Sequence, residues 1–345
     1  MNMMRFTTMK TKLRKYPSIF LILLLAISSC FLTGCVNQHP KDSKKSSQGE
    51  SVETMLEITD PKEKQAVLNA KAKVKALSGN PRIVATSPAV ADICDKLDLD
   101  LVGVPKSSVS KIPSRYKKVK KVGLAMSPDM EIVSSLNPDW ILAPSSLETD
   151  LKPKFEELKN TEYAFLNLRS VQGMYRSAQE LGEIFGKQQE AEKMTKEFTT
   201  FYKSYTKRNK KHPKVLVLMG LPGSYVIATE NSYVGSLVKL AGGENVYQNT
   251  DQEFLTVNTE DMKKKEPDII VRAAHALPDQ VTKMFNEDFE TNDIWKHFDA
   301  VKNKRVYDLT YEYFGMSANF KYKKALSELE KDFYQNTKGT QEVKE

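Results

Sequence analysis

The sequence predicts an α/β protein with two lobes, each built on a central, mainly parallel sheet, and a single long backbone helix that joins them. Three observations lead to this prediction. Short β-branched runs alternate with helical patterns from Arg82 onward, a long helical stretch interrupts the alternation near the middle, and the chain has 345 residues. About 310 residues remain once a removable N-terminal segment is set aside, which is more than one hydrophobic core usually organises.

Eight short apolar runs are predicted to be strands, four in each half of the chain. They read "RIVAT", "DLVGV", "WILA" and "YAFLNL" in the first half, then "KVLVLM", "YVIAT", "DIIV" and "VYDL" in the second. Strands that alternate with helical patterns favour α/β lobes with mainly parallel sheets. We therefore expect an N-terminal lobe over residues 80–169, a C-terminal lobe over 212–335 and a disordered tail over 336–345.

The segment 170–211 is predicted to hold the linking helices. Apolar residues recur at helical spacing up to Gly186, a suitable C-cap, and a second helical run follows from about Lys187 to Asn209. At 1.5 Å per residue this second helix would be about 35 Å long. A helix of that length can act as a stiff strut between two lobes, so we expect a largely preformed cleft between them.

The N-terminus has the pattern of an export signal. A basic segment precedes the apolar run 19–27, which is too short to span a bilayer, and the signal is followed by Cys35, the last residue of "LTGC". This ending resembles the lipobox of bacterial lipoproteins, in which the cysteine is acylated and becomes the new N-terminus. The interpretation is a signal peptide over 1–34, a lipidated Cys35, a flexible tether over 35–79, and a protein held on the extracytoplasmic face of the cell membrane.

Charge and residue counts narrow the function classes. Five of the 52 Lys and Arg residues and none of the 44 Asp and Glu residues precede Cys35, so the mature chain would carry a net charge of only +3, which argues against a nucleic-acid partner. Cys94 would be the one remaining thiol, so we expect no disulfide, and we expect a monomer. Nucleophile-elbow, zinc-protease and P-loop motifs are absent, and His212 and His297 have no clustered partners; we therefore predict a protein without catalytic turnover.

The two halves share a short internal repeat. "EIVSSLNPDWIL" and "EDMKKKEPDIIV" both consist of Glu, six residues, Pro-Asp and a strand, which places Glu131 and Glu260 at equivalent positions. Two ordinary amphipathic helices that each end before a proline would give the same pattern. The spacing alone leaves both interpretations open.

Several residues are candidate ligands for a bound group. His275 follows the predicted strand in "IIVRAAHALPDQ", where open α/β sheets bind ligands, although a plain loop residue fits the position equally. Met126, in "VGLAMSPDMEIV", and Met316, in "YFGMSANF", have similar local sequences, and either could be a ligand or core filler. Arg272 and Tyr225 could line the same pocket, although Arg272 could also hold a surface acid. The segment "TSPAVADI" could offer helix N-terminal amides to an anion, or Thr86 and Ser87 could be an ordinary N-cap pair.

A long part of the chain, about residues 80–335, resembles the substrate-binding lipoproteins of iron-compound ABC importers. The resemblance rests on "KHPKVLVLMGLPGSYVIATENSYVGSLVKLAGGENV", "NDIWKHFDAVKNKRVYDL", "CDKLDLDLVGVPKS" and "VTKMFNEDFETNDIW". This family has a helical backbone between its lobes, the class III fold of periplasmic binding proteins. Within it, the chain is most similar to the heme-binding members.

The resemblance implies that heme b is the transported ligand, with Met126 and His275 as axial ligands of the iron. It also implies heme contacts whose positions fall on two loops, at Pro88, Ala89, Ser107 and Ser108. In the family the position of Ser108 is often aromatic and the loop "PKSSVSKIP" is one residue shorter. A thioether and an imidazole are both suitable axial ligands of heme iron.

The implied partners are an ABC permease with its ATPase, contacted through Glu131 and Glu260, and upstream surface proteins that transfer heme. The predicted function is therefore a membrane-anchored heme receptor of an ABC importer. The alternative is a ferric siderophore receptor of the same kind of importer, which would hold its ligand through Arg272, Tyr225 and Trp140.

Overall fold

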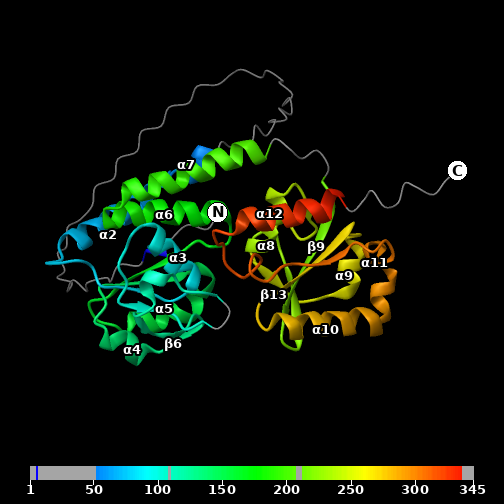
Figure 1. The fold of residues 1–345 in the computed structure, drawn as a ribbon, viewed down its shortest axis with the longest axis horizontal. Helices are drawn as coiled ribbons and strands as arrows, with labels where there is room; N and C mark the ends of the chain where they lie inside the picture. Colours follow the sequence, from blue (N-terminus) through cyan, green and yellow to red (C-terminus); the bar gives the residue numbers. More distant parts are fainter. Residues whose placement is uncertain (1–4, 7–51, 108–109, 207–211, 336–345) are drawn as a thin grey trace, which may run out of the picture.

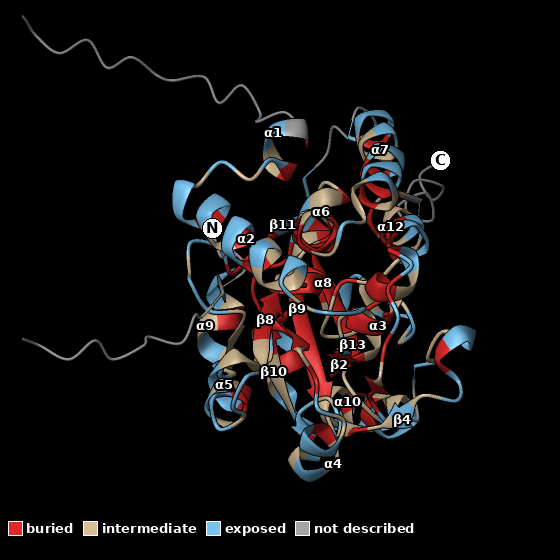
Figure 2. Cartoon of the chain, turned by 90° about the vertical axis from the view of Figure 1, so that its left-hand side faces the viewer, coloured by how far each residue is buried: buried red, intermediate tan, exposed pale blue. Residues whose placement is uncertain are grey.

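Two α/β lobes lie side by side beneath a layer of helices in the computed structural model (Figure 1). The structure describes residues 5–6, 52–107, 110–206 and 212–335. The helices α6, α7 and α12 cover one end of the molecule, whereas α4 and α10 lie at the opposite end in both views (Figures 1 and 2). The predictions for the signal peptide apart from residues 5–6, for Cys35, for Ser108 and for the tail 336–345 fall outside the described residues.

The N-terminal lobe contains a sheet with the strand order β1-β8-β7-β2-β3-β4, in which every pair except β1–β8 is parallel. Its strands are β1 (Arg5–Phe6), β2 (Ile83–Ala85), β3 (Gly103–Val104), β4 (Lys120–Lys121), β7 (Trp140–Pro144) and β8 (Glu162–Leu166), and a separate hairpin is formed by β5 (Gly123–Leu124) and β6 (Ser127–Pro128). Its helices are α3 (Pro88–Lys96), η1 (Ser114–Tyr116), α4 (Met130–Ser135), η2 (Ser145–Leu147) and α5 (Glu148–Glu156). β1 belongs to the predicted signal peptide. Cleavage of the signal peptide would therefore remove β1 and leave β8 at the sheet edge.

The C-terminal lobe has a mixed sheet with the order β12-β10-β9-β13-β14, and β11 also pairs with β9. Its strands are β9 (Lys214–Leu221), β10 (Ser224–Ala228), β11 (Glu244–Asn245), β12 (Phe254–Leu255), β13 (Ile269–Ala274) and β14 (Val306–Asp308). Its helices are α8 (Tyr233–Leu240), α9 (Thr259–Lys264), α10 (Pro278–Thr291), η3 (Asp293–His297), α11 (Asp299–Lys302), α12 (Tyr322–Glu330) and η4 (Lys331–Gln335). β11, β9, β13 and β14 run parallel to one another, whereas β10 is antiparallel to both β9 and β12.

All eight predicted strands are present, and their burial explains why the sequence revealed them. β2, β7 and β13 are buried along their whole length, as expected for strands that helices cover on both faces. The structure adds β1, β4, β5, β6, β11 and β12, each of two residues, which are too short to produce a periodic pattern. The predicted α/β architecture with mainly parallel sheets is confirmed.

The internal repeat is a repeat of structure as well as of sequence. In the first lobe the Asp139 carboxylate accepts a hydrogen bond from the Arg82 backbone N–H at 2.7 Å, and in the second the Asp268 carboxylate accepts one from the Lys214 backbone N–H at 2.8 Å. Each aspartate thereby joins the start of one strand to the start of its parallel neighbour, β2 to β7 and β9 to β13. The repeated Pro-Asp therefore holds the same strand pair in register in both lobes.

The lobes are linked by two helices that lie side by side, α6 (Val171–Phe185) and α7 (Gln188–Tyr205). Gly186 ends α6 in the left-handed conformation with φ of 72°, as predicted for a C-cap. α7 then runs back over the molecule to the second lobe (Figure 1). Its 18 residues make it about 27 Å long, shorter than expected, and the connection is a helical hairpin instead of one isolated strut.

The tether predicted over residues 35–79 extends too far, because part of this segment is helical. α1 (Val52–Leu56) and α2 (Pro61–Lys75) pack against α6, and Val67 and Ala70 of α2 are buried. The polar composition of α2 suggested a flexible chain. Its charged side chains instead pair with partners about a hundred residues away, which no local pattern could reveal. Among the described residues, no helix has the length and apolar character needed to cross a bilayer.

The contact between α2 and α6 contains a buried charged cluster. The Arg176 guanidinium of α6 pairs with Glu63 of α2 and lies 3.6 Å from the Glu180 carboxylate, and both carboxylates are almost fully buried. Burial, followed by the neighbouring Glu63, raises the pKa of Glu180 well above its ordinary value. One guanidinium thus neutralises one carboxylate, while the second is stabilised in its protonated form.

We predict that Glu180→Gln leaves the free energy of unfolding at pH 7.5 unchanged or increases it. Because the folded pKa of Glu180 is raised, the native state binds more protons than the unfolded state above pH 4.5, so this group lowers stability as pH rises. The glutamine variant should lose that decline when denaturant midpoints are compared from pH 5 to pH 8. Arg176→Gln is the matched contrast and should cost about 3 kcal/mol or more, because it leaves a buried carboxylate unpaired. A large loss of stability in Glu180→Gln at every pH would contradict the protonated assignment.

Candidate ligand-binding site

Met126 lies at the turn of the small hairpin formed by β5 and β6. Gly123 pairs with Pro128 and Leu124 with Ser127, so Ala125 and Met126 form a two-residue turn. Gly123 has φ of 96°, and a Cβ atom there would lie 2.8 Å from the backbone nitrogen of Asp129, so glycine is required at the base of the hairpin. Asp129 caps α4, so Pro128 belongs to β6 and does not begin the helix. The hairpin thus presents the Met126 thioether away from the core.

His275 follows directly after β13, at the carboxyl end of the second sheet. Its backbone N–H donates a 2.8 Å hydrogen bond to the Gly220 carbonyl, and its carbonyl accepts one from the Tyr311 hydroxyl at 3.1 Å. The backbone is therefore held at two points, while the imidazole ring has no hydrogen-bond partner among the described residues. Burial lowers the pKa of His275, which favours the neutral ring that can bind a metal ion.

Exposed apolar side chains gather on the same two loops. Among the described residues, four large hydrophobic side chains are exposed: Leu68, Leu124, Met126 and Leu277. Leu124 and Met126, at 58% and 62% exposure, belong to the hairpin, and Leu277, at 50%, lies two residues after His275. Leu277 also adopts the left-handed conformation with φ of 44°, which is uncommon for leucine. Exposed apolar side chains and backbone strain on loops that also carry two donor atoms indicate a ligand-binding site.

The start of α3 lies at the carboxyl end of β2 in the first lobe. The Ser87 side chain accepts a hydrogen bond from the Val90 N–H at 3.3 Å and caps the helix, and Thr86 is buried with its hydroxyl bonded to the Leu142 carbonyl. Pro88 has no N–H, and the Ala89 N–H has no partner in the described part of the chain. This helix end therefore offers one amide and a favourable dipole to an anionic group.

The structure pairs Arg272, a candidate partner for a ligand carboxylate, with an acid of its own lobe. Its guanidinium is buried, donates to the Asp308 carboxylate at 2.6 and 2.7 Å and to the Asn286 side chain at 2.8 Å, and lies over the Phe289 ring. The parallel pairing of β13 with β14 places Arg272 directly opposite Asp308. These contacts occupy the Nε and Nη2 donors of Arg272, which therefore stabilises the second sheet.

Tyr225 is also committed to the second lobe. Its hydroxyl donates to the Asp288 carboxylate at 2.8 Å, and its ring packs with Phe285 and Trp295. Trp140, which the siderophore alternative would use, is buried and packs edge-on against Phe185. The Tyr225 hydroxyl and the Trp140 ring are thus engaged in contacts within the protein.

The two candidate methionines differ in their surroundings. Met316 is partly buried and packs against the main hydrophobic core, whereas Met126 is exposed. This difference favours Met126 as the ligand and Met316 as core filler. On the neighbouring loop, the Ser107 hydroxyl accepts a 3.0 Å bond from the Ser110 N–H.

Sequence reasoning missed three residues of this site. Leu124 and Leu277 supply apolar surface, and Tyr311 holds the backbone of His275. The pattern "GLAMSP" around Met126 could have indicated Leu124, because Gly and Pro bound a turn that contains two large apolar residues. Tyr311 has no such signal, since it meets His275 only through the tertiary fold.

Residues 83–313 match the model of a family described as periplasmic binding protein. The chain belongs to the periplasmic binding protein family. It is 42% identical over 264 residues to the high-affinity heme uptake system protein IsdE of Staphylococcus aureus, a match that covers 76% of this chain and 90% of that protein.

Two solved structures of this binding-protein family agree with the fold. An ABC transporter substrate-binding protein from Listeria monocytogenes EGD-e has 50% identity and a TM-score of 0.70, and covers 75% of this chain and all of its own. S. aureus IsdE complexed with heme has 42% identity and a TM-score of 0.70, and covers 74% of this chain and all of its own. The fold is thus that of the class III binding proteins, with two α/β lobes joined by helices.

Proposed function

We propose that this protein is the heme receptor of an ABC importer, which binds heme outside the cell and delivers it to a permease for iron acquisition. The observation that carries the proposal is a pair of donors, an exposed thioether in the first lobe and, in the second, an imidazole that has no hydrogen-bond partner among the residues that the structure describes. Sulfur and neutral imidazole suit heme iron. The similarity to IsdE, whose structure is known with heme, supports the same ligand.

The proposed geometry has Met126 and His275 as axial ligands, with the porphyrin held between apolar side chains. Leu124 and Leu277 would cover apolar porphyrin surface that is otherwise exposed to water. The start of α3, at Pro88 and Ala89, would receive a propionate carboxylate through its free amide and helix dipole. Ser107 and Ser108 belong to the neighbouring loop and are proposed to contact the ligand as well.

A siderophore receptor is the less supported alternative. It would require cationic and aromatic side chains directed at the ligand, yet Arg272, Tyr225 and Trp140 are engaged in internal contacts. Membership of a binding-protein family also fits a role without turnover of the ligand. We therefore propose no enzymatic activity.

Two parts of the proposal concern location and partners. Cys35 is proposed to be acylated after removal of residues 1–34, which would hold a monomeric receptor on the outer face of the cell membrane. Glu131 and Glu260 are proposed to contact the permease, which works with an ATPase. Both glutamates are exposed in the first turn of six-residue helices, α4 and α9, at equivalent positions of the structural repeat.

We predict that His275→Ala weakens heme binding at least about tenfold, because the stronger axial ligand is lost. Met126→Ala should retain heme but shift the absorption spectrum toward high spin, because one axial position opens. His297→Ala, a change of an exposed histidine on η3, is the matched control and should leave the spectrum unchanged. If Met316→Ala produces the high-spin shift and Met126→Ala does not, the axial methionine is misassigned. A wild-type protein that forms no Soret band with heme would overturn the proposed function.

The double variant Glu131→Ala, Glu260→Ala should bind heme normally but fail to pull down the permease or support growth on heme. Loss of one partner from a desolvated charge pair commonly costs about 2 to 5 kcal/mol. Glu157→Ala with Glu290→Ala, which also removes one exposed acid from each lobe, is the control and should behave as wild type. Normal growth of the first variant at wild-type protein levels would refute the docking role.

For the anchor, Cys35→Ala should abolish labelling of the protein by radioactive fatty acid in growing cells and move it from the membrane fraction to the medium or the precursor pool. The reason is that acylation requires the cysteine thiol, and two acyl chains are needed for stable anchoring. Continued acyl labelling of the variant would contradict the assignment of Cys35.

A further inference from the structure

One segment of the first lobe is strongly basic. Residues 106–121 contain seven Lys and Arg residues and no Asp or Glu, although the lobe as a whole, residues 80–169, has thirteen basic and twelve acidic residues. The segment includes η1 and β4, and β4 is the edge strand of the sheet. Positive charge is therefore concentrated in one part of the lobe.

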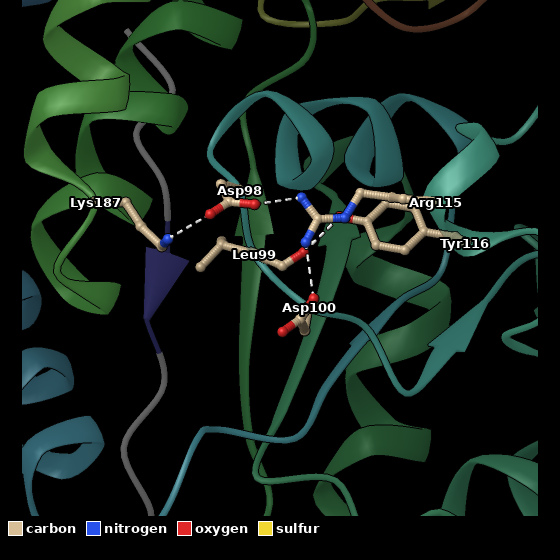
Figure 3. Close-up of polar contacts among 6 residues, drawn as sticks. All are labelled: Asp98, Leu99, Asp100, Arg115, Tyr116 and Lys187. Carbon is tan, nitrogen blue, oxygen red and sulfur yellow. Dashed lines mark hydrogen bonds and ion pairs between the residues drawn. The ribbon is translucent and has the colours of Figure 1, made fainter.

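Arg115 differs from the lysines because it serves the fold. Its guanidinium pairs with Asp98 at 2.7 Å and with Asp100 at 2.8 Å, and Asp98 also pairs with Lys187 at the start of α7 (Figure 3). The neighbouring Tyr116 is buried and its hydroxyl donates to the Leu99 carbonyl at 2.5 Å. These contacts fix the middle of the segment to the loop after α3.

The six lysines of the segment remain without acidic partners. We call them the basic strip: Lys106, Lys111, Lys117, Lys118, Lys120 and Lys121. None forms an ion pair with another described residue, and all except the half-buried Lys121 are exposed. Lys111 lies near one acid of the other lobe, Glu312, whose pKa is lowered mainly by Lys321 and to a smaller extent by Lys111. Apart from this weak interaction of Lys111, the strip therefore carries positive charge that no ion pair within the described part of the chain neutralises.

The basic strip begins and ends at the hairpin that carries Met126. The Lys106 N–H donates to the Gly123 carbonyl at 2.6 Å, and β4, which contains Lys120 and Lys121, leads through Val122 into Gly123. Because Gly123 is the base of the Met126 hairpin, both ends of the strip adjoin the candidate site. A partner held by the strip would lie beside the point where the ligand enters or leaves.

The second lobe has no counterpart of this charge. β11 pairs with β9 as β3 pairs with β2, so residues 246–257 occupy the equivalent place between β11 and α9. That segment contains Asp251 and Glu253 and no basic residue. On a scaffold with two structurally similar lobes, this asymmetry can determine which way round a charged partner approaches.

We propose that the basic strip is a docking surface for a protein partner that presents clustered carboxylates at the site, namely the protein that delivers the ligand. This inference rests on the proposed function. A flat anionic bilayer is less suitable, because the exposed Asp129 and Glu131, which directly follow the Met126 hairpin, would be repelled. A protein surface can place its carboxylates at the strip alone.

The test uses the full-length chain and a fluorescent deca-glutamate peptide as a defined source of clustered carboxylates. In Lys117→Gln, Lys118→Gln, Lys120→Gln, the association rate constant for the peptide at low ionic strength should fall about tenfold. The matched control, Lys64→Gln, Lys193→Gln, Lys196→Gln, removes the same charge from exposed positions of α2 and α7 and should change the rate less than twofold. In wild type, the peptide should also slow the uptake of free hemin, because it occupies the neighbouring surface.

Three results would overturn the inference. Equal losses of the association rate constant in the two triple variants would show that the peptide responds only to the net charge of the protein. A fall in free hemin uptake by the strip variant without peptide would assign the lysines to the carboxylates of the ligand. The strip variant could also bind phosphatidylglycerol vesicles less well than wild type, relative to phosphatidylcholine vesicles, while its peptide binding is unchanged. That result would assign the lysines to lipid. The proposed function fails separately, through the absence of a Soret band in the wild type with hemin.

Discussion

The relative position of the two lobes depends on aromatic packing among α6, α7 and α12. Tyr175 of α6 stacks on Phe198 of α7 with ring centroids 4.5 Å apart, and Tyr322 of α12 packs edge-on against both rings. Rings in such arrangements contribute beyond the apolar area that they bury, and they resist rotation. Because the two candidate donors come from different lobes, this cluster also determines how far apart they are held.

The two lobes are variations on one unit, and the site arises where they differ. Asp139 and Asp268 each form the same hydrogen bond between two neighbouring parallel strands, one pair in each lobe. The scaffold of the two lobes is therefore similar. The loops at the carboxyl ends of the strands are not constrained in this way. The first lobe places a methionine hairpin and a basic segment there, and the second places a histidine held by Tyr311. Function is carried by loops that a rigid scaffold positions.

The candidate site is also a place where the protein forgoes stability. Leucine in the left-handed conformation at Leu277 and the exposed apolar side chains Leu124 and Met126 are each unfavourable for the free protein. Burial of an apolar ligand would offset the exposure, and the strain would be maintained by the surrounding contacts. A site that is unfavourable when empty favours a bound ligand, which suits a receptor that must retain its cargo until delivery.

The sequence by itself determined the eight main strands, the helix end at Gly186, the repeat and the loops that carry Met126 and His275. These features are local: β-branched runs, a glycine after a helical pattern, and residues next to a strand end are visible in short windows. Only the tertiary structure decided which polar and apolar side chains were free. Strand pairing placed Asp308 opposite Arg272, which the sequence left open between a ligand and a protein acid. Arg176 supplied a partner for Glu63 of α2, in a segment predicted to be a tether. Met126 and Met316 look alike in sequence, yet one is exposed and the other packs against the core. Composition states which groups a chain has, but whether a group is already satisfied depends on partners that are distant in the sequence.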